Sequence, residues 1–216
     1  MKKILHISAS PRGRAAESYR LSRRVVDCLL LQEPAAIVVD RMLGGCDIPH
    51  VDEAYAISQQ SLVDAPGEGG SMARSAALIE ELVGADVVVI GTPMHNYTVP
   101  SALKAWIDHI ARVRWTFNVT PAGKRPALRD RPVFVAVSSG GRFSGDRARQ
   151  PDFLTPYLKT ILGMIGLQDV TFFSVQGTAS GPDSLADSRA RADQALHDHF
   201  SAMATPDLPS AVGEAG

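Results

Sequence analysis

The chain has 216 residues, of which 45% are hydrophobic and 21% charged, and its formal net charge is −1. This composition is typical of a globular domain and excludes a disordered chain. Because the charge is balanced, no field of one sign favours nucleic acid or an anionic membrane as a partner. Two cysteines do not make a disulfide framework in a chain of this length. We expect one domain over residues 1–203 and a flexible tail over residues 204–216.

The beginning of the chain does not have the pattern of a targeting segment. Its apolar run, residues 4–7, is only about four residues long, whereas the apolar region of a secretory signal peptide has about 7–15. No stretch approaches the roughly 20 apolar residues of a membrane-spanning helix. The sequence therefore predicts a cytoplasmic protein with no membrane partner.

Five short runs of β-branched and apolar residues lack polar alternation, which is typical of strands covered on both faces. In chain order they span residues 4–7, 37–39, 87–90, 133–137 and 170–175. A segment with apolar residues at helical spacing follows each run. These segments span residues 18–31, 71–83, 103–110, 152–165 and 185–203. The alternation predicts an α/β fold, a flavodoxin-like doubly wound five-stranded parallel sheet of order 2-1-3-4-5 with helices on both faces.

Residues that favour helix ends stand at several of these boundaries. Ser71 is expected to cap the second helix, and Pro100 stands near the first turn of the third. Asp152 is expected to cap the fourth helix, and Gly166 to end it.

Two long connections stand outside the alternation. Residues 41–70 are rich in Gly, Asp and Pro, and residues 114–131 form a second excursion. Connections of this length are usually functional or disordered. Cys46 lies in the first connection and is interpreted as an unremarkable thiol, whereas Cys28 lies in an apolar helical stretch and is interpreted as a core residue.

Ligands of a doubly wound sheet bind beyond the carboxyl ends of its strands, at the point where the strand order reverses. For this order, that point lies between the first and third strands. The loops after the first, third and fourth strands, residues 8–18, 91–100 and 138–142, are therefore the expected ligand-binding loops.

The three loops differ in chemistry. Residues 8–18 combine small hydroxyl residues, a glycine and a helix N-terminus, which suit a phosphate group. Residues 91–100 combine Pro, Asn and an aromatic residue, which suit a planar ring with hydrogen-bonding edges. Gly140 and Gly141 permit close approach of the backbone to a ligand. Each loop alone also fits an ordinary strand-to-helix turn, but three at adjacent strand ends favour a ligand site.

Other chemistries find no support in the sequence. His197 and His199 lie two apart on a predicted helix, so they face different directions and cannot jointly hold a metal ion. No dinucleotide, Walker A, H-E-x-x-H, C-x-x-C or G-x-S-x-G pattern is present. His6 and His109 stand in apolar patterns and are interpreted as structural. We therefore predict neither a metal site nor a side-chain nucleophile.

Several motifs together resemble one family, the FMN-dependent NADH-azoreductases, also described as FMN-dependent NADH:quinone oxidoreductases. The motifs are residues 93–97 (PMHNY), 103–108 (LKAWID), 112–117 (RVRWTF), 154–167 (LTPYLKTILGMIGL) and 176–179 (QGTA). The resemblance covers most of residues 2–203, with residues 8–18 as its weakest part. It implies a flavodoxin-like homodimer with FMN at the dimer boundary.

The resemblance also implies a set of FMN contacts. They are Ser10, Ala16, Glu17, Ser18, Met94, His95, Asn96, Tyr97, Ser138, Ser139, Gly140 and Gly141. Ser10 and Ser18 are expected to donate to the phosphate, residues 94–97 to hold the isoalloxazine ring, and residues 138–141 to close over its other edge. Because a carboxylate beside a phosphate is unfavourable, the Glu17 side chain is expected to point away while its backbone N–H serves the phosphate.

The family's activity implies a ping-pong reaction through bound FMN. NADH or NADPH reduces the flavin and leaves, and a quinone then takes two electrons, whereas an azo compound needs two turns to be cleaved. His95, Tyr97, Trp115 and Phe117 are the candidates for the acceptor pocket, partly across the dimer. For Trp115 and Phe117, packing at the dimer interface is the alternative role.

The sequence departs from the family pattern at several of these positions. The family usually has Ser at the position of Ala16, Tyr at that of His95 and Phe at that of Tyr97. Arg is common where Ser139 stands, and Val119 replaces an aromatic residue of the acceptor pocket. The acceptor preference is therefore open. Two other readings stay open as well, a flavodoxin-like electron carrier, which would have a strongly acidic surface, and a binding protein without a cofactor.

Overall fold

The computed structural model describes residues 1–45, 48–60 and 69–204, and its centre is one parallel sheet of five strands in the order β2-β1-β3-β6-β7. The strands are β1 (Lys3–Ser8), β2 (Ile37–Met42), β3 (Val87–Pro93), β6 (Val133–Ser139) and β7 (Val170–Gln176). The register pairs Ile7 with Ile90 and Ile90 with Val135, so the three central strands end close together. The predicted sheet and its strand order are confirmed.

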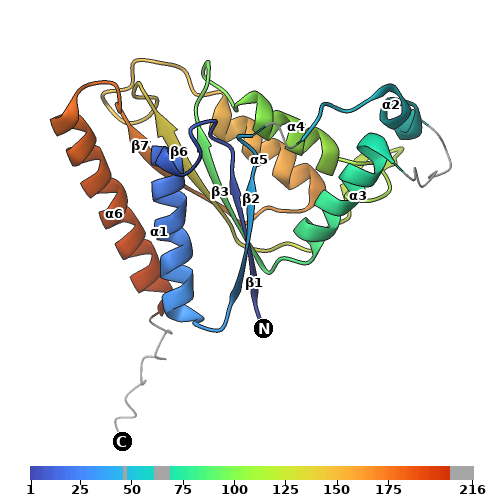
Figure 1. Cartoon of the computed structure of the whole chain (residues 1–216), viewed down its shortest axis with the longest axis horizontal. Helices are drawn as coiled ribbons and strands as arrows, with labels where there is room; N and C mark the ends of the chain where they lie inside the picture. The colour runs from blue at the N-terminus through green and yellow to red at the C-terminus, as the bar shows by residue number, and fades with distance from the viewer. Residues whose placement is uncertain (46–47, 61–68, 205–216) are drawn as a thin grey trace, which may run out of the picture.

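Helices cover both faces of the sheet (Figure 1). On one face lie α1 (Glu17–Gln32) and α6 (Pro182–Ala204). On the other lie α3 (Gly70–Val83), α4 (Ser101–Ile110) and α5 (Leu154–Ile165). All five are the helices that the apolar spacing predicts. Each helix packs a stripe of buried residues against the sheet and exposes residues on its outer side, as expected of amphipathic helices on a doubly wound sheet.

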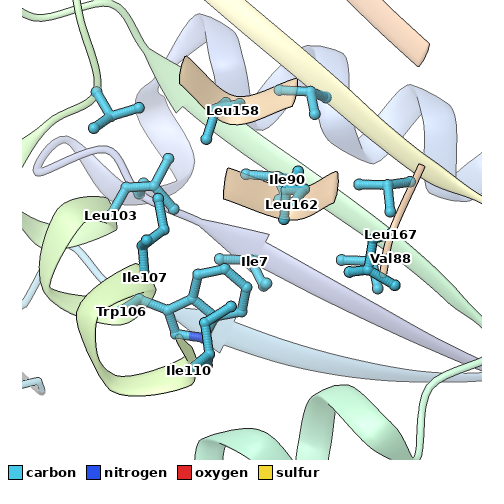
Figure 2. Close-up of a cluster of buried hydrophobic side chains, with 14 of the residues drawn as sticks. Ile7, Val88, Ile90, Leu103, Trp106, Ile107, Ile110, Leu158, Leu162 and Leu167 are labelled. Carbon is cyan, nitrogen blue, oxygen red and sulfur yellow. The ribbon is translucent and has the colours of Figure 1, made fainter. Parts of the chain in front are cut away.

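A large apolar core lies between the sheet and helices α3, α4 and α5 (Figure 2). Trp106 of α4 and Leu158 of α5 are at most 1% exposed and pack above Ile7 of β1 and Ile90 of β3. Burying a side chain of this kind contributes about 1.5–3 kcal/mol. This core fixes the central strands, and therefore the loops at their carboxyl ends.

A second core lies on the opposite face of the sheet, and aromatic rings make up its part beside α6. Leu21 and Val25 of α1 pack against Val89 and Phe134 of the sheet. Towards α6, Phe134 contacts His199 edge-on, with 5.7 Å between the ring centroids. His199 is thus half-buried among aromatic rings, whereas the neighbouring His197 is exposed on the outer side of α6.

The helix-end predictions are partly confirmed. Asp152 accepts hydrogen bonds from the backbone N–H groups of Leu154 and Thr155, both at 2.9 Å, and Gly166 ends α5 with a φ of +116°. A left-handed residue of this kind ends many helices and is most often glycine.

The prediction for Ser71 is wrong. Helix α3 begins at Gly70, so Ser71 is already inside its first turn. The carboxylate that accepts from the Ser71 N–H belongs to Asp52, at 3.0 Å, and it also accepts from the N–H of Tyr55 at 2.8 Å. These hydrogen bonds, that of Tyr55 first, hold the pKa of Asp52 below its usual value. A distant carboxylate therefore replaces the local cap.

Both long connections contain secondary structure that the sequence did not predict. The first contains α2 (Glu53–Gln60), whose Tyr55 hydroxyl donates to the Asp108 carbonyl at 2.8 Å. The second contains a hairpin of β4 (Phe117–Thr120) and β5 (Gly123–Pro126). Cys46 and the predicted tail beyond residue 204 lie outside the described residues. Within the described residues, no helix combines the length and apolar character of a membrane span.

Candidate functional site

The three predicted ligand loops meet at the carboxyl edge of the sheet. The Ala9 N–H donates to the Gly91 carbonyl at 2.8 Å, which joins the first loop to the end of β3. The Met94 N–H donates to the Ser138 carbonyl at 2.8 Å, which joins the second loop to the third. This edge is the switch point between β1 and β3, where the fold places its ligands.

A cavity of about 500 Å³ opens between these loops. The predicted contact residues that line it are Ser10, Ala16, Glu17, Met94, His95, Ser138, Ser139 and Gly140. Ser18, Asn96, Tyr97 and Gly141 are not among its lining residues. The remaining lining residues are Pro11, Arg12, Ala15, Pro93, Thr178, Leu185 and Arg189. A cavity of this size accommodates a small organic ligand or cofactor.

On one side of the cavity stands the beginning of α1. A short 3-10 turn, η1 (Gly13–Ala15), leads into Ala16, which is the N-cap residue and provides no side-chain cap. The first N–H groups of a helix lack intrahelical partners and carry positive partial charge. The Ser18 hydroxyl is buried and has no hydrogen-bond partner within the described part of the chain. An unsatisfied helix start and hydroxyl of this kind suit a bound anion.

Gly91 allows α1 to begin this close to the sheet. A Cβ atom at Gly91 would lie 2.5 Å from the Ser22 Oγ and 2.9 Å from the Ser18 carbonyl oxygen. Contacts this short require something to move. Any residue larger than glycine at this position would therefore push the start of α1 away from β3 and disturb the cavity.

The second loop is a tight turn. The backbones of His95 and Thr98 exchange two hydrogen bonds, at 2.9 and 3.0 Å, around Asn96 and Tyr97. Asn96 and Tyr97 have φ values of +49° and +68°, a conformation rare for residues other than glycine. Strain of this kind is concentrated at functional sites. The turn leaves Tyr97 47% exposed beside the cavity's His95.

The third loop is held by residues that sequence reasoning missed. The Gln150 amide donates to the Ser139 Oγ at 3.0 Å and contacts the Met94 Sδ at 3.1 Å. The Thr178 N–H donates to the Ser139 carbonyl at 3.1 Å, and the Gly177 N–H to the Gly141 carbonyl at 3.1 Å. The family resemblance included residues 176–179, and therefore Gly177 and Thr178, but nothing in the sequence pointed to Gln150. These contacts come from separate loops, which local sequence patterns do not connect.

Two of the three charged residues that line the cavity, Glu17 and Arg189, form an ion pair. The Glu17 carboxylate accepts from the Arg189 Nε at 3.0 Å and from the Arg20 Nε at 3.3 Å. The hydrogen bond with Arg189 is the largest cause that lowers the pKa of Glu17 below its usual value. Glu17 is one of the lining residues of the cavity, and its carboxylate is bonded to arginines of α6 and α1. Arg189 comes from α6, and no local signal in the sequence indicated it.

A second cavity of about 410 Å³ adjoins the first and shares Pro11 and His95 with it. It lies between residues 43–44 and 48–50 on one side and α4 on the other, and its lining is mostly apolar. Its other lining residues are Ala9, Leu43, Gly44, Ile48, Pro49, His50, Pro100, Ser101, Ala102 and Ala105. His95 therefore stands at the boundary between a polar and an apolar region.

The other predicted acceptor residues lie outside both cavities. Phe117 is buried in the apolar core, at 8% exposure. Trp115 is 37% exposed, and the guanidinium of Arg112 lies 4.3 Å from its ring. Val119 is 68% exposed on β4. Of the four candidates, His95 is the one that lines these two cavities. No group of three His, Cys, Asp or Glu residues suited to a metal ion occurs among the described residues.

The fold and the cavity at its switch point define a flavodoxin-like α/β protein. Residues 2–200 match the family model described as "Flavodoxin-like fold". An azoreductase from Bacillus anthracis superposes with a TM-score of 0.80 at 21% identity, over 94% of this chain and 100% of that one. An FMN-dependent NADH-azoreductase of the same species, in complex with FMN, gives a TM-score of 0.77 at 22% identity, over 95% and 100%.

The curated relatives narrow the class to one family. An FMN-dependent NADH:quinone oxidoreductase of Pseudomonas fluorescens is 43% identical, over 90% of this chain and 92% of that protein. One of Cupriavidus pinatubonensis is also 43% identical, over 86% and 91%. The chain belongs to the flavodoxin-like fold family and, within it, to the family of the FMN-dependent NADH:quinone oxidoreductases. The predicted resemblance is confirmed.

Proposed function

We propose that the protein binds FMN in the cavity at the strand ends and transfers electrons from NADH to quinones, and that it also cleaves aromatic azo compounds reductively. One observation carries the proposal, namely that three loops meet around a 500 Å³ cavity in a chain 43% identical to FMN-dependent NADH:quinone oxidoreductases. FMN, when bound, supplies the two-electron chemistry, and the protein supplies position and electrostatics.

The residues that line the cavity and those next to it in the same loops fit the chemical parts of FMN. The hydroxyls of Ser10 and Ser18 and the first N–H groups of α1 would hold the phosphate, because that helix start has no side-chain cap. Residues 94–97 would hold the isoalloxazine ring, and residues 138–141 would close over its other edge. The hydrogen bond between the Met94 N–H and the Ser138 carbonyl keeps these two loops together.

Donor and acceptor would use the same pocket in turn. We propose NADH as the donor because the curated relatives are named for it, and NADPH stays an alternative that measurement decides. A quinone would then accept two electrons in one turn, and an azo bond would need two turns. No side-chain nucleophile takes part, so the protein's work is to position donor and acceptor and to exclude water.

The acceptor region would extend across His95 into the apolar cavity beside α4. This cavity of about 410 Å³ offers apolar surface to a quinone ring, and His95 and His50 offer hydrogen bonds to its carbonyl oxygens. Tyr97, Trp115 and Phe117 would complete the pocket in part from the partner subunit. For Trp115 and Phe117, packing between subunits is the second candidate role.

We also propose a homodimer that works in the cytoplasm. Tyr97 and Phe153 are 47% and 60% exposed, and the Phe153 N–H donates to the Tyr97 carbonyl at 3.0 Å, so the two exposed rings belong to neighbouring backbone. Exposed apolar side chains beside a cavity favour an interface. The cytoplasmic location is supported by the proposed donor, since NADH is a cofactor of the cell interior.

The test is an absorption spectrum of the purified protein with FMN, before and after anaerobic addition of NADH. Flavin bands that shift on binding and bleach with NADH would support the oxidoreductase, and reoxidation by a quinone would identify the acceptor class. Bands that persist with both NADH and NADPH would favour an electron carrier. A protein that binds no FMN would overturn the proposed function and favour a binding protein without a cofactor.

A further inference from the structure

Glu17 creates an electrostatic problem at the proposed phosphate site. It is the first residue of α1, it lines the cavity, and its side chain is only 17% exposed. A bare carboxylate here would repel a phosphate that approaches the same helix start. Ala16 adds to the problem, since it provides no hydroxyl to the site.

Arg189 removes this repulsion. Its Nε and Nη2 both bond to the Glu17 carboxylate, so the pair is bidentate. Bidentate arginine–carboxylate pairs are among the strongest hydrogen-bonded pairs in proteins. Arg20 makes a longer contact to Glu17, at 3.3 Å, but Arg20 is also engaged by Asp193 at 3.2 Å. The charge of Glu17 is therefore neutralised mainly from α6.

Arg189 also faces the cavity itself. It lines the cavity together with Leu185, which lies one helical turn earlier on α6. The guanidinium has further N–H donors beyond those bonded to Glu17. Its Nη1 has no hydrogen-bond partner within the part of the chain that the structure describes. Arg12 is the second cation of the lining, but it stands on an exposed loop.

We infer that Arg189 is a phosphate-binding residue for FMN, which holds the Glu17 carboxylate with one edge of its guanidinium and the phosphate with the other. The inference rests on the proposed function. It assigns to α6 a part of the phosphate site that the start of α1 lacks, since Ala16 has no hydroxyl and Glu17 has the wrong charge. Glu17 and Arg189 then act as a unit, because removing the arginine leaves an uncompensated carboxylate beside the phosphate.

The experiment compares FMN with riboflavin, which lacks the phosphate. Full-length protein freed of flavin is titrated with each, and the dissociation constants are read from flavin fluorescence. The variants are Arg189→Gln, Glu17→Gln and the double variant Arg189→Gln/Glu17→Gln. Arg191→Gln is the matched control, since Arg191 is an exposed arginine of the same helix that lines a different cavity.

We expect Arg189→Gln to raise the Kd for FMN about 10- to 100-fold, because it removes a charge-assisted bond and unpairs Glu17. The Kd for riboflavin should change less than about twofold, since the effect acts through the phosphate. Glu17→Gln should tighten FMN binding, because it removes the carboxylate charge beside the phosphate. The double variant should recover the part of the loss that comes from the unpaired carboxylate, but it should still bind FMN more weakly than Glu17→Gln, because the bond from Arg189 to the phosphate is missing. Riboflavin binding also reports that each variant is folded.

Three results would overturn the inference while the proposed function stands. They are an Arg189→Gln variant that binds FMN as the wild type does, equal losses for FMN and riboflavin, and a double variant that binds FMN as tightly as Glu17→Gln does. An Arg191→Gln variant with the same loss would show a general field effect of α6 and would also count against it. Failure of the wild type to bind FMN would instead overturn the proposed function.

Discussion

The two faces of the sheet bury different kinds of groups. Under α3, α4 and α5 the sheet contacts a core of apolar side chains such as Trp106, Leu158 and Leu162. Under α1 and α6, the apolar core is smaller and includes buried polar chemistry, with His6 between Asp40 and Ser22. The ion pair of Glu17 and Arg189 joins the same two helices at the cavity. One face mainly supplies stability, whereas the other also shapes the ligand site.

Asp40, His6 and Ser22 form a polar chain with the residue types of a hydrolase triad, but its serine is not accessible. His6 Nδ1 lies 2.7 Å from the Asp40 carboxylate, and Nε2 lies 2.8 Å from the Ser22 Oγ. Ser22 is completely buried, and its Oγ lies against Gly91 in β3. A substrate cannot reach a hydroxyl in this position, so the chain ties α1, β1 and β2 together instead.

The largest effect is expected from the apolar face. Trp106→Ala should lower the free energy of unfolding by about 3–5 kcal/mol, because it empties a large volume in a core that cannot collapse fully. The measurement is urea unfolding followed by circular dichroism. Leu31→Ala is the control, since Leu31 is 83% exposed on α1 and should change stability by less than about 0.5 kcal/mol. A loss below about 1 kcal/mol for Trp106→Ala would contradict this view of the core.

A smaller loss of stability, combined with a loss of binding, is expected on the other face. Gly91→Ala should destabilise by about 1–3 kcal/mol, because the new methyl group overlaps Ser22 and the Ser18 carbonyl. It should also weaken FMN binding, since the start of α1 must move. Gly163→Ala is the control. A Cβ at Gly163 meets nothing within 4 Å, so this helical change should be neutral or stabilise by about 0.5–1 kcal/mol. Equal effects of the two substitutions would argue against the close approach of α1 to Gly91.

The buried histidine should make this face sensitive to acid. Burial lowers the pKa of His6, against the opposing effect of Asp40. The folded protein therefore keeps His6 neutral at pH values where the unfolded chain, with a pKa near 6.5, takes up a proton. The contribution of neutral His6 to the stability of the fold is complete above pH 6.5. It is lost as the pH falls towards the lowered pKa of His6 in the folded protein.

For one proton this loss cannot exceed about 1.4 kcal/mol per pH unit. The measurement is urea unfolding of the wild type and His6→Gln at pH 7.5 and 5.5, above the range in which the carboxylates titrate. The wild type should lose more stability than the variant over this interval. The same loss in both proteins would mean that other groups set the acid sensitivity.

The smallest effects are expected from exposed ion pairs, one on each face. Arg23→Gln removes a pair with Asp27 on α1, and Lys104→Gln removes a pair with Asp108 on α4. Each should change stability by no more than about 0.5 kcal/mol, because solvent screens exposed charges. Unfolding at low and high salt checks this. A clear difference in the free energy of unfolding between these two variants would show that surface charges, and not only buried groups, distinguish the two faces.

Much of the fold follows from local patterns. The runs 87–90 and 133–137 are apolar without alternation, and the structure places both at the centre of the sheet. Asp152 and Gly166 act within a few residues of themselves, so their roles at the ends of α5 are readable from the sequence. The positions of the three ligand loops follow from strand order alone.

Other features depend on contacts between distant residues, and local periodicity contains no information about them. The cap of α3 comes from Asp52 instead of the nearby Ser71, and α2 and the β4–β5 hairpin form within segments that have little periodicity of their own. Arg189 reaches Glu17 across 172 positions of the chain, and Gln150 reaches Met94 from another loop. The sequence by itself determined the strand order, the five helices that cover the sheet and the loops of the site. Only the tertiary structure decided which charges face one another there, because packing of α1 and α6 on the same face brings them together.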